Sequence, residues 1–231
     1  MRQLTILLIN WTCFSACKRN VDPTEDPPKS RFIFAEYFIR YLEPESEIKA
    51  HASFYEGDTL NPSEPKTYLG GVIFQGNKMK ARELTDNSIR YTITTRGKYR
   101  EDFLFQHRDD EGNHWEYEIQ MSPIKDFFIK DDIISKSDGM TLVVNGGLLT
   151  DEESLVLLFT DEDNKASSLT IEGPSNSIEH FITPESLETL TPGFGQLYLV
   201  KKQAKLVAED YLRAVSEIEY YSKILPITVS D

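Results

Sequence analysis

Residues 102–121 read DFLFQHRDDEGNHWEYEIQM, and this stretch decides the fold class. Pairing Asp109 with Asn113 leaves a three-residue loop that ends in Gly112, a residue that accepts the positive φ such loops need. In that register apolar and aromatic side chains face one another: Phe103 with Ile119, Phe105 with Tyr117, and His107 with Trp115. A slip by one residue would set both phenylalanines opposite glutamates, so the turn and the hydrophobic pattern predict the same antiparallel hairpin.

The same alternation of apolar and polar side chains recurs along the chain. Residues 48–55 and 89–94 show it clearly, and it is typical of strands with one buried face. Turn residues separate three further strand candidates: 141–145, 155–159 and 168–172. We therefore expect an all-β protein of two tandem β-sandwich (Ig-like) domains, residues 31–123 and 124–231.

Three segments depart from simple alternation. Thr183-Pro184-Glu185 has the pattern of a helix start, so we expect one short helix over Pro184–Leu190. The continuous apolar run 155–159 suits a strand buried on both faces, although a short buried helix stays open. Residues 203–215 could be strand or helix, and the neighbouring Leu197–Val200 favours strand.

The second half shows one weak family pattern. Leu190, Gly193 and Tyr198 are placed like a tyrosine corner that leads into a late strand, which resembles the immunoglobulin and fibronectin type III class. Residues 124–231 lack the cysteine pair and the core tryptophan of antibody-type domains. The resemblance implies an architecture and no function.

The first 17 residues have the pattern of a targeting signal. Arg2 precedes the apolar run Leu4–Thr12, and small residues, Ser15 and Ala16, come directly before Cys17. This pattern resembles the lipobox of bacterial lipoproteins, with Phe14 where that family usually has leucine. The resemblance implies cleavage between Ala16 and Cys17 and lipidation of Cys17, which makes residues 1–16 a signal peptide.

The segment after Cys17 looks like a tether. Residues 17–30 are polar and include three prolines, a composition that favours an extended linker. In the lipoprotein family an aspartate after the cysteine retains the protein at the inner membrane. Lys18 stands there in this chain, so the resemblance implies a lipid anchor in the outer membrane. Whether the body faces the periplasm or the exterior stays open.

The net charge and the positions of the histidines bear on two classes of partner, nucleic acids and metal ions. The formal net charge of −13 opposes binding to phosphate, so we expect no nucleic-acid partner. His107 and His114 flank the acidic turn at residues 109–111 and suggest a metal site. The hairpin register sends them to opposite faces of the sheet, so they cannot share an ion. We expect no metal and no cofactor.

No catalytic motif is present in the sequence. It contains no G-x-S-x-G, H-E-x-x-H, P-loop or G-x-G-x-x-G pattern. The chain has two cysteines, Cys13 and Cys17, so none lies in residues 31–231 to act as a nucleophile. We therefore expect no catalytic residues and a protein that is not an enzyme.

Most aromatic residues follow the apolar faces and are explained by core packing. The exceptions are Tyr55, Phe127, Phe128, Tyr220 and Tyr221, and we name the last four as the candidate ligand or interface residues. The phenylalanines would either pack between the halves or bind a ligand. The expected function is a lipid-anchored, non-enzymatic accessory module of the cell envelope that works through a protein partner. The alternative is a glycan-binding surface lipoprotein.

Overall fold

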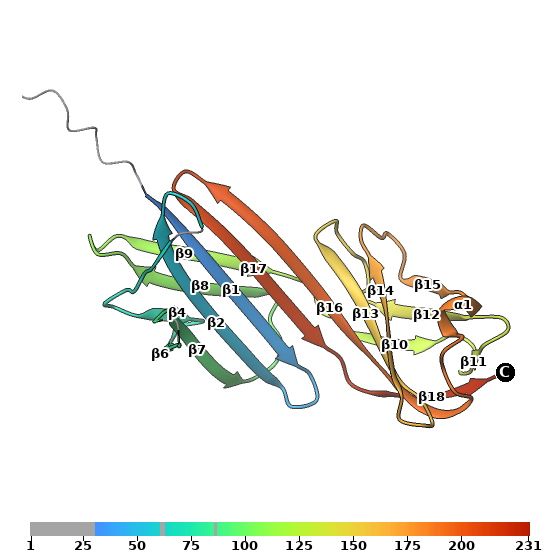
Figure 1. The fold of residues 1–231 in the computed structure, drawn as a ribbon. Helices are drawn as coiled ribbons and strands as arrows, with labels where there is room; N and C mark the ends of the chain where they lie inside the picture. The colour runs from blue at the N-terminus through green and yellow to red at the C-terminus, as the bar shows by residue number, and fades with distance from the viewer. Residues whose placement is uncertain (1–30, 61–62, 86) are drawn as a thin grey trace, which may run out of the picture.

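The structure is a computed structural model that describes residues 31–60, 63–85 and 87–231. These residues form an elongated molecule of β-sheets with one short helix, α1 (Pro184–Leu187) (Figure 1). This confirms the expected all-β, sandwich-like class. No helix within the described ranges is long and apolar enough to cross a membrane. Ala16 and Cys17, with the rest of the expected signal peptide and linker, lie outside the described residues.

The largest sheet has eleven strands. They are β1 (Phe32–Leu42), β2 (Glu47–Gly57), β3 (Glu64–Pro65), β6 (Lys80–Glu83), β7 (Ile89–Arg96), β11 (Ile134–Ser135), β13 (Glu153–Thr160), β14 (Ala166–Glu172), β16 (Gly193–Glu209), β17 (Leu212–Tyr221) and β18 (Leu225–Ser230). The main path runs β11-β18-β16-β17-β1-β2-β7-β6; off this path, β13 pairs with β16, β14 pairs with β13, and β3 pairs with β2.

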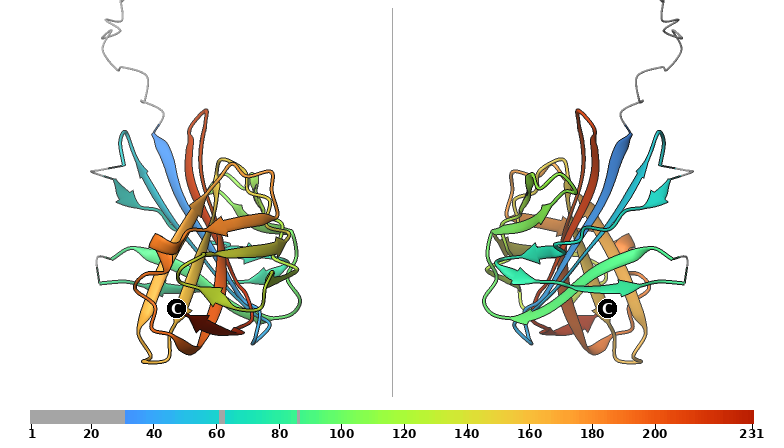
Figure 2. Two further views of the ribbon diagram at one scale, coloured as in Figure 1. Left: turned by 90° about the vertical axis from the view of Figure 1, so that its right-hand side faces the viewer. Right: turned by 90° about the vertical axis from the view of Figure 1, so that its left-hand side faces the viewer.

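Two smaller sheets complete the described fold. The four-stranded sheet has the order β5-β4-β8-β9: β4 is Val72–Phe74, β5 Asn77–Lys78, β8 Asp102–Arg108 and β9 His114–Gln120. The three-stranded sheet has the order β10-β12-β15: β10 is Asp126–Ile129, β12 Met140–Asn145 and β15 Glu179–Ile182. Figure 2 shows the layers from the two ends of the molecule.

The β8–β9 hairpin has the predicted register. Its paired residues include Phe103 with Ile119, Phe105 with Tyr117, and His107 with Trp115. The Asp109 N–H donates to the Asn113 carbonyl at 3.0 Å and closes the loop, in which Gly112 has φ +89°. The left-handed conformation therefore falls on the glycine, as the turn chemistry requires.

Aromatic side chains hold the four-stranded sheet against the large one. Tyr37 of β1 stacks on Tyr117 of β9, with centroids 4.3 Å apart and planes 7° apart. It also packs against Phe105 of β8 at 4.9 Å. Burial of such large rings stabilises the two layers by about 1.5–3 kcal/mol for each side chain. In β2 the predicted inner face is buried, as Ala52 and Phe54 show, but Ser53 of the opposite face is also buried, so the alternation is confirmed only in part.

Strand β16 connects the two halves of the chain. Residues 196–203 pair with β13, and residues 200–209 pair with β17. β17 then pairs in parallel with β1 from Ile33 to Leu42. The last part of the sequence therefore completes the sheet of the first part, as the long adjacent ribbons of Figure 1 show. Strand pairing thus crosses the expected boundary at residue 123, and the division into two domains stays a prediction.

The ambiguous segments now have definite structures. Residues 203–215 belong to β16, β17 and the turn between them, so the strand alternative is right. The helix ends at Leu187, three residues earlier than expected, and the Thr183 side chain makes no capping bond. In β13, Leu155, Leu157 and Phe159 are buried while the residues between them are half-buried. The expectation of equal burial on both faces was wrong, because one face of β13 remains partly open to solvent.

Candidate aromatic binding cleft

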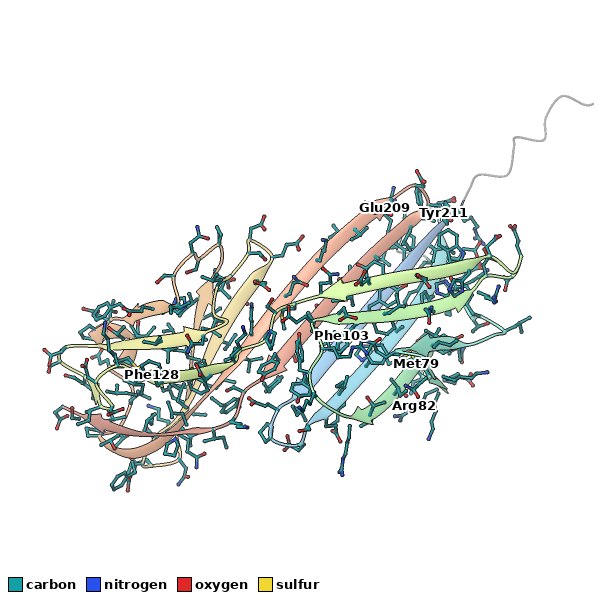
Figure 3. The ribbon with its side chains drawn as sticks, turned by 180° about the vertical axis from the view of Figure 1, so that it is seen from behind. Met79, Arg82, Phe103, Phe128, Glu209 and Tyr211 are labelled. Atoms are coloured by element: carbon teal, nitrogen blue, oxygen red, sulfur yellow. The ribbon has the colours of Figure 1, made fainter. Side chains whose placement is uncertain are left out.

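A cleft of about 390 Å³ opens at the end of the molecule where β1 begins. Three segments meet there: the residues after β3, the β8–β9 loop, and the turn between β16 and β17. Figure 3 shows Tyr211 at the tip of the β16–β17 turn, at the end opposite Phe128. The volume lies within the usual range for small-molecule sites, about 300–1,000 Å³.

Aromatic rings form the floor of the cleft. Tyr37 and Tyr117 are stacked, and the Tyr117 hydroxyl hydrogen-bonds to the Ser216 hydroxyl at 3.2 Å. Tyr68 packs on His107 with centroids 4.1 Å apart, and its N–H donates to the Tyr91 hydroxyl at 2.9 Å. These contacts fix the rings before any ligand arrives, so the floor is preorganised.

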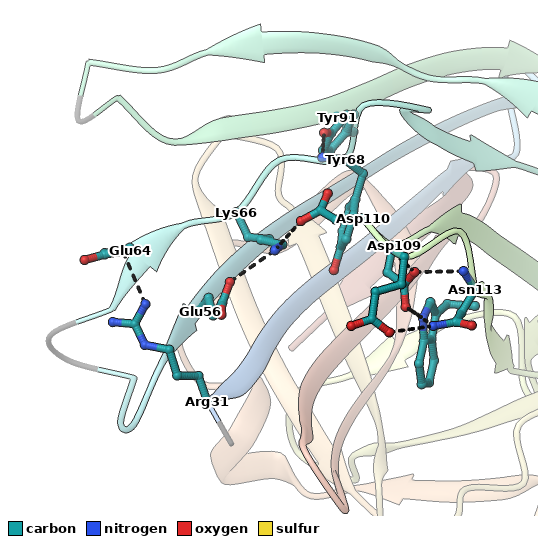
Figure 4. Close-up of polar contacts among 11 residues, drawn as sticks. Arg31, Glu56, Glu64, Lys66, Tyr68, Tyr91, Asp109, Asp110 and Asn113 are labelled. Carbon is teal, nitrogen blue, oxygen red and sulfur yellow. Dashed lines mark hydrogen bonds and ion pairs between the residues drawn. The ribbon is translucent and has the colours of Figure 1, made fainter. Parts of the chain in front are cut away.

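Asp109 fixes the side chain of Trp115. Its carboxylate accepts hydrogen bonds from the Trp115 indole N–H at 3.0 Å and the Asn113 side chain at 2.8 Å. It also accepts from the backbone N–H groups of Glu111 and Asn113, at 3.0 and 2.8 Å. These hydrogen bonds lower the pKa of Asp109 to about 2, and the bond from Trp115 contributes most. The carboxylate is therefore charged at neutral pH and holds the indole of Trp115. Figure 4 shows the contacts between Asp109 and Asn113.

Trp115 and Tyr211 form the aromatic edge of the cleft. Their rings meet at 89° with centroids 5.3 Å apart. Trp115 is half-buried and Tyr211 is 39% exposed, so both rings keep surface that a ligand can cover. Burial raises the pKa of Tyr211, and the nearby carboxylates of Asp109, Asp210 and Glu111 raise it further.

Lys66 lies on the rim of the cleft and is paired with two carboxylates. The Lys66 ammonium group is 2.8 Å from an Asp110 carboxylate oxygen and 3.1 Å from one of Glu56, as Figure 4 shows. The hydrogen bond that Lys66 donates to Asp110 is the main cause of the raised pKa of Lys66. Glu116, also on the rim, accepts from the Gln106 side chain at 2.8 Å and lies 2.9 Å from His114. These bonds lower the pKa of Glu116, and the hydrogen bond from Gln106 contributes most.

His107 is uncharged at neutral pH. Burial lowers its pKa to about 4, and the nearby Asp109 carboxylate opposes this only in part. The ring packs between Tyr68 and Phe54 as an aromatic side chain. In the described part of the chain, no cluster of three or more histidine, cysteine or acidic residues could hold a metal ion.

The four aromatic residues singled out in the sequence do not line this cleft. Tyr220 is buried against Tyr41 and Tyr99, at 5.3 and 5.0 Å. Tyr221 is half-buried and donates to Glu219. Phe127 packs at the edge of the hydrophobic core, and Phe128 is 45% exposed. A ligand or interface role for the four residues stays a prediction.

Most of the residues that line the cleft could not be identified from the sequence. Trp115 and Tyr117 were placed on the inner face of the hairpin, but nothing pointed to the partner segments. Tyr211 reaches the cleft through the pairing of β17 with β1, which no local pattern reveals. Tyr68 lies in an irregular stretch without periodicity. The acidic loop at residues 109–111 is the local signal for a site here, and its residue types suggest a metal ion rather than an aromatic cleft.

No family model and no curated protein matches the chain. One solved structure with a weak likeness is the Bacteroides ovatus mixed-linkage glucan utilization locus SGBP-B in complex with a mixed-linkage heptasaccharide. It shares 14% sequence identity over 84% of this chain, with a TM-score of 0.21. The chain spans 43% of the length of that protein. At this TM-score the likeness supports no inference about the ligand.

Proposed function

We propose that this protein is a non-enzymatic, glycan-binding lipoprotein of the bacterial cell envelope. The observation that carries this proposal is the pair Trp115 and Tyr211 at the edge of a cleft floored by further aromatic rings. Sugar rings present apolar C–H faces that pack on aromatic rings, and hydroxyl groups that bond to carboxylates and hydroxyls. The cleft offers both kinds of surface next to each other.

Binding fits this site better than catalysis does. A catalytic carboxylate needs a free oxygen near the reacting atoms. Asp109 instead accepts four hydrogen bonds from its own hairpin, and Asp110 is paired with Lys66. His107 is packed between aromatic rings and neutral, so it is poorly placed to move a proton. The polar groups serve to shape the cleft.

The anchor in this proposal comes from the sequence. Lipidation of Cys17 would attach the protein to the outer membrane, and residues 17–30 would link it to the body that begins at Arg31. The cleft is lined by Ile33, near the start of β1, so it would open toward the tethered end.

Affinity gel electrophoresis tests the proposal. The protein is run through gels that contain soluble β-glucan, α-glucan, mannan or xylan, and retardation by one of them is expected. Trp115→Ala should weaken the binding about tenfold or more, since it removes a central aromatic contact. Phe181→Ala is the matched control, because Phe181 is 61% exposed and does not line the cleft. Equal retardation of both variants would contradict the assignment of the site.

A protein partner is the second candidate, favoured by one observation. Phe128 and Phe181 are exposed on the outer strands of the three-stranded sheet, at 45% and 61%. Mild detergent extraction followed by affinity purification tests this candidate. A stoichiometric partner that is lost with Phe128→Ser/Phe181→Ser would support it, and retention of that partner by the variant would count against it.

A further inference from the structure

The charges that line the cleft are unequal. Four lining residues carry carboxylates, Asp109, Asp110, Glu111 and Glu116, and Lys66 is the lining ammonium group. The lining histidine, His107, is neutral at pH 7 because burial disfavours its charged form. A ligand that enters the cleft therefore meets a net negative surface.

Lys66 is also committed to internal partners. It forms ion pairs with Glu56 and Asp110, at 3.1 and 2.8 Å, and its side chain is 22% exposed. An anionic ligand could recruit this ammonium group only by displacing a carboxylate that would then remain beside the ligand. Two carboxylates around one ammonium leave no net positive charge for a third anion.

The hydrogen-bonding groups that line the cleft also disfavour an anionic ligand. The Trp115 indole N–H is bonded to Asp109, and the Asn113 side-chain amide donates to Asp109 and to Glu111. Carboxylate oxygens are acceptors only when ionised. Sugar hydroxyls can donate to such acceptors, whereas ligand carboxylates and sulfates supply further acceptors. The rim carboxylates of Asp110 and Glu116 are 55% and 53% exposed, so a ligand can reach them.

We infer that the cleft selects uncharged glycan chains and rejects chains that carry carboxylate or sulfate groups. This inference rests on the proposed glycan-binding function. The acidic rim acts in two ways: it bonds to hydroxyl groups, and it repels uronic acids and sulfated sugars. Trp115 and Tyr211 supply the affinity, and the carboxylates supply the selection by charge.

Matched polymers separate charge from sugar type. The full-length protein is run at low ionic strength in gels that contain hydroxyethyl cellulose or carboxymethyl cellulose, and in a parallel pair of hydroxyethyl and carboxymethyl starch. We expect retardation by the neutral member of at least one pair, and none by its carboxymethyl partner. Equal or stronger retardation by the carboxymethyl member would overturn the charge selection and leave glycan binding in place. No retardation by these polymers or by the wider panel of the previous subsection would overturn both proposals.

A charge variant tests whether the rim causes the selection. Glu111→Gln/Glu116→Gln removes two lining charges, and Glu36→Gln/Glu118→Gln removes two exposed charges outside the cleft lining. The first variant should raise the ratio of anionic to neutral retardation by about threefold to tenfold, and added salt should reduce that difference. The second should leave the ratio unchanged. An equal rise of this ratio in the two variants would show that the overall charge of the protein, and not the rim of the cleft, causes the selection against anionic glycans.

Discussion

Replacing Lys201 by methionine should lower the free energy of unfolding by about 3–5 kcal/mol. Lys201 is 1% exposed and lies on β16, where this strand pairs with both β13 and β17. Its ammonium group is 3.3 Å from a Glu153 oxygen and donates to the carbonyls of Leu148 and Gly146, at 3.1 and 3.4 Å. Glu153 is 6% exposed, and its other oxygen accepts the Thr150 N–H.

The magnitude follows from the burial of the charge that remains. Lys201→Met leaves the Glu153 carboxylate buried with one oxygen unpaired, and an uncompensated buried charge is costly. At about 2–4 °C for each kcal/mol in a chain of this size, the melting temperature should fall by roughly 6–20 °C. Lys201→Met/Glu153→Leu removes both charges and should recover most of the loss, since buried pairs add little net stability.

Urea unfolding followed by circular dichroism measures both changes. Lys205→Met is the matched control on the same strand, because Lys205 is 50% exposed and 3.8 Å from Glu152. Exposed pairs of this kind contribute about 0–1 kcal/mol. A loss below about 1 kcal/mol for Lys201→Met, or a double variant less stable than the single one, would refute the reasoning.

Three further predictions concern the cleft and its loop. Asp109→Ala should shift the emission of Trp115 to longer wavelength and weaken glycan binding about tenfold or more, because the indole loses its fixed position; unchanged emission and binding would contradict this role. His107 has a folded pKa of about 4 against 6.5 in the unfolded chain, so its neutral form contributes stability that is present above pH 6.5 and lost as pH falls to 4. His107→Phe should therefore reduce the loss of stability in urea unfolding between pH 7 and 4.5 by about 2 kcal/mol, and an unchanged pH dependence would argue against burial of the ring. Gly112→Ala should lower the stability by about 1–2 kcal/mol in thermal unfolding, because φ is +89° at Gly112 and the added carbon has no atom within 4 Å to clash with, so that backbone strain is the cost. Gly97→Ala is the control, because its added carbon also meets open space. An equal loss of stability in both variants would exclude backbone strain as the cause.

Local patterns predicted the strands but not their long-range partners. The β8–β9 register follows from residues close in sequence, since the turn and the apolar pairs agree on one alignment. The parallel pairing of β1 with β17 joins residues about 180 positions apart, and alternation does not specify which strand lies beside which. Tyr211 belongs to the cleft through that pairing, which explains why the sequence did not reveal it.

The candidate tyrosines show a related limit. Tyr220 and Tyr221 are adjacent in a strand, so their side chains point to opposite faces, and one of them had to be buried. Tyr220 is the buried member, within an aromatic cluster that holds the sheets together. Composition and spacing could not distinguish these packing roles from ligand contact.

Fluorescence of Trp115 tests the central claim most directly. The sequence contains two tryptophans, Trp11 and Trp115, so Trp11→Phe in the full-length chain leaves Trp115 as the sole tryptophan. Titration with a neutral oligosaccharide of the polymer that retards the protein should give a saturable change in emission, and Tyr211→Ala should weaken that binding. If the oligosaccharide binds by calorimetry while the emission of Trp115 stays unchanged, the aromatic cleft is not the glycan site.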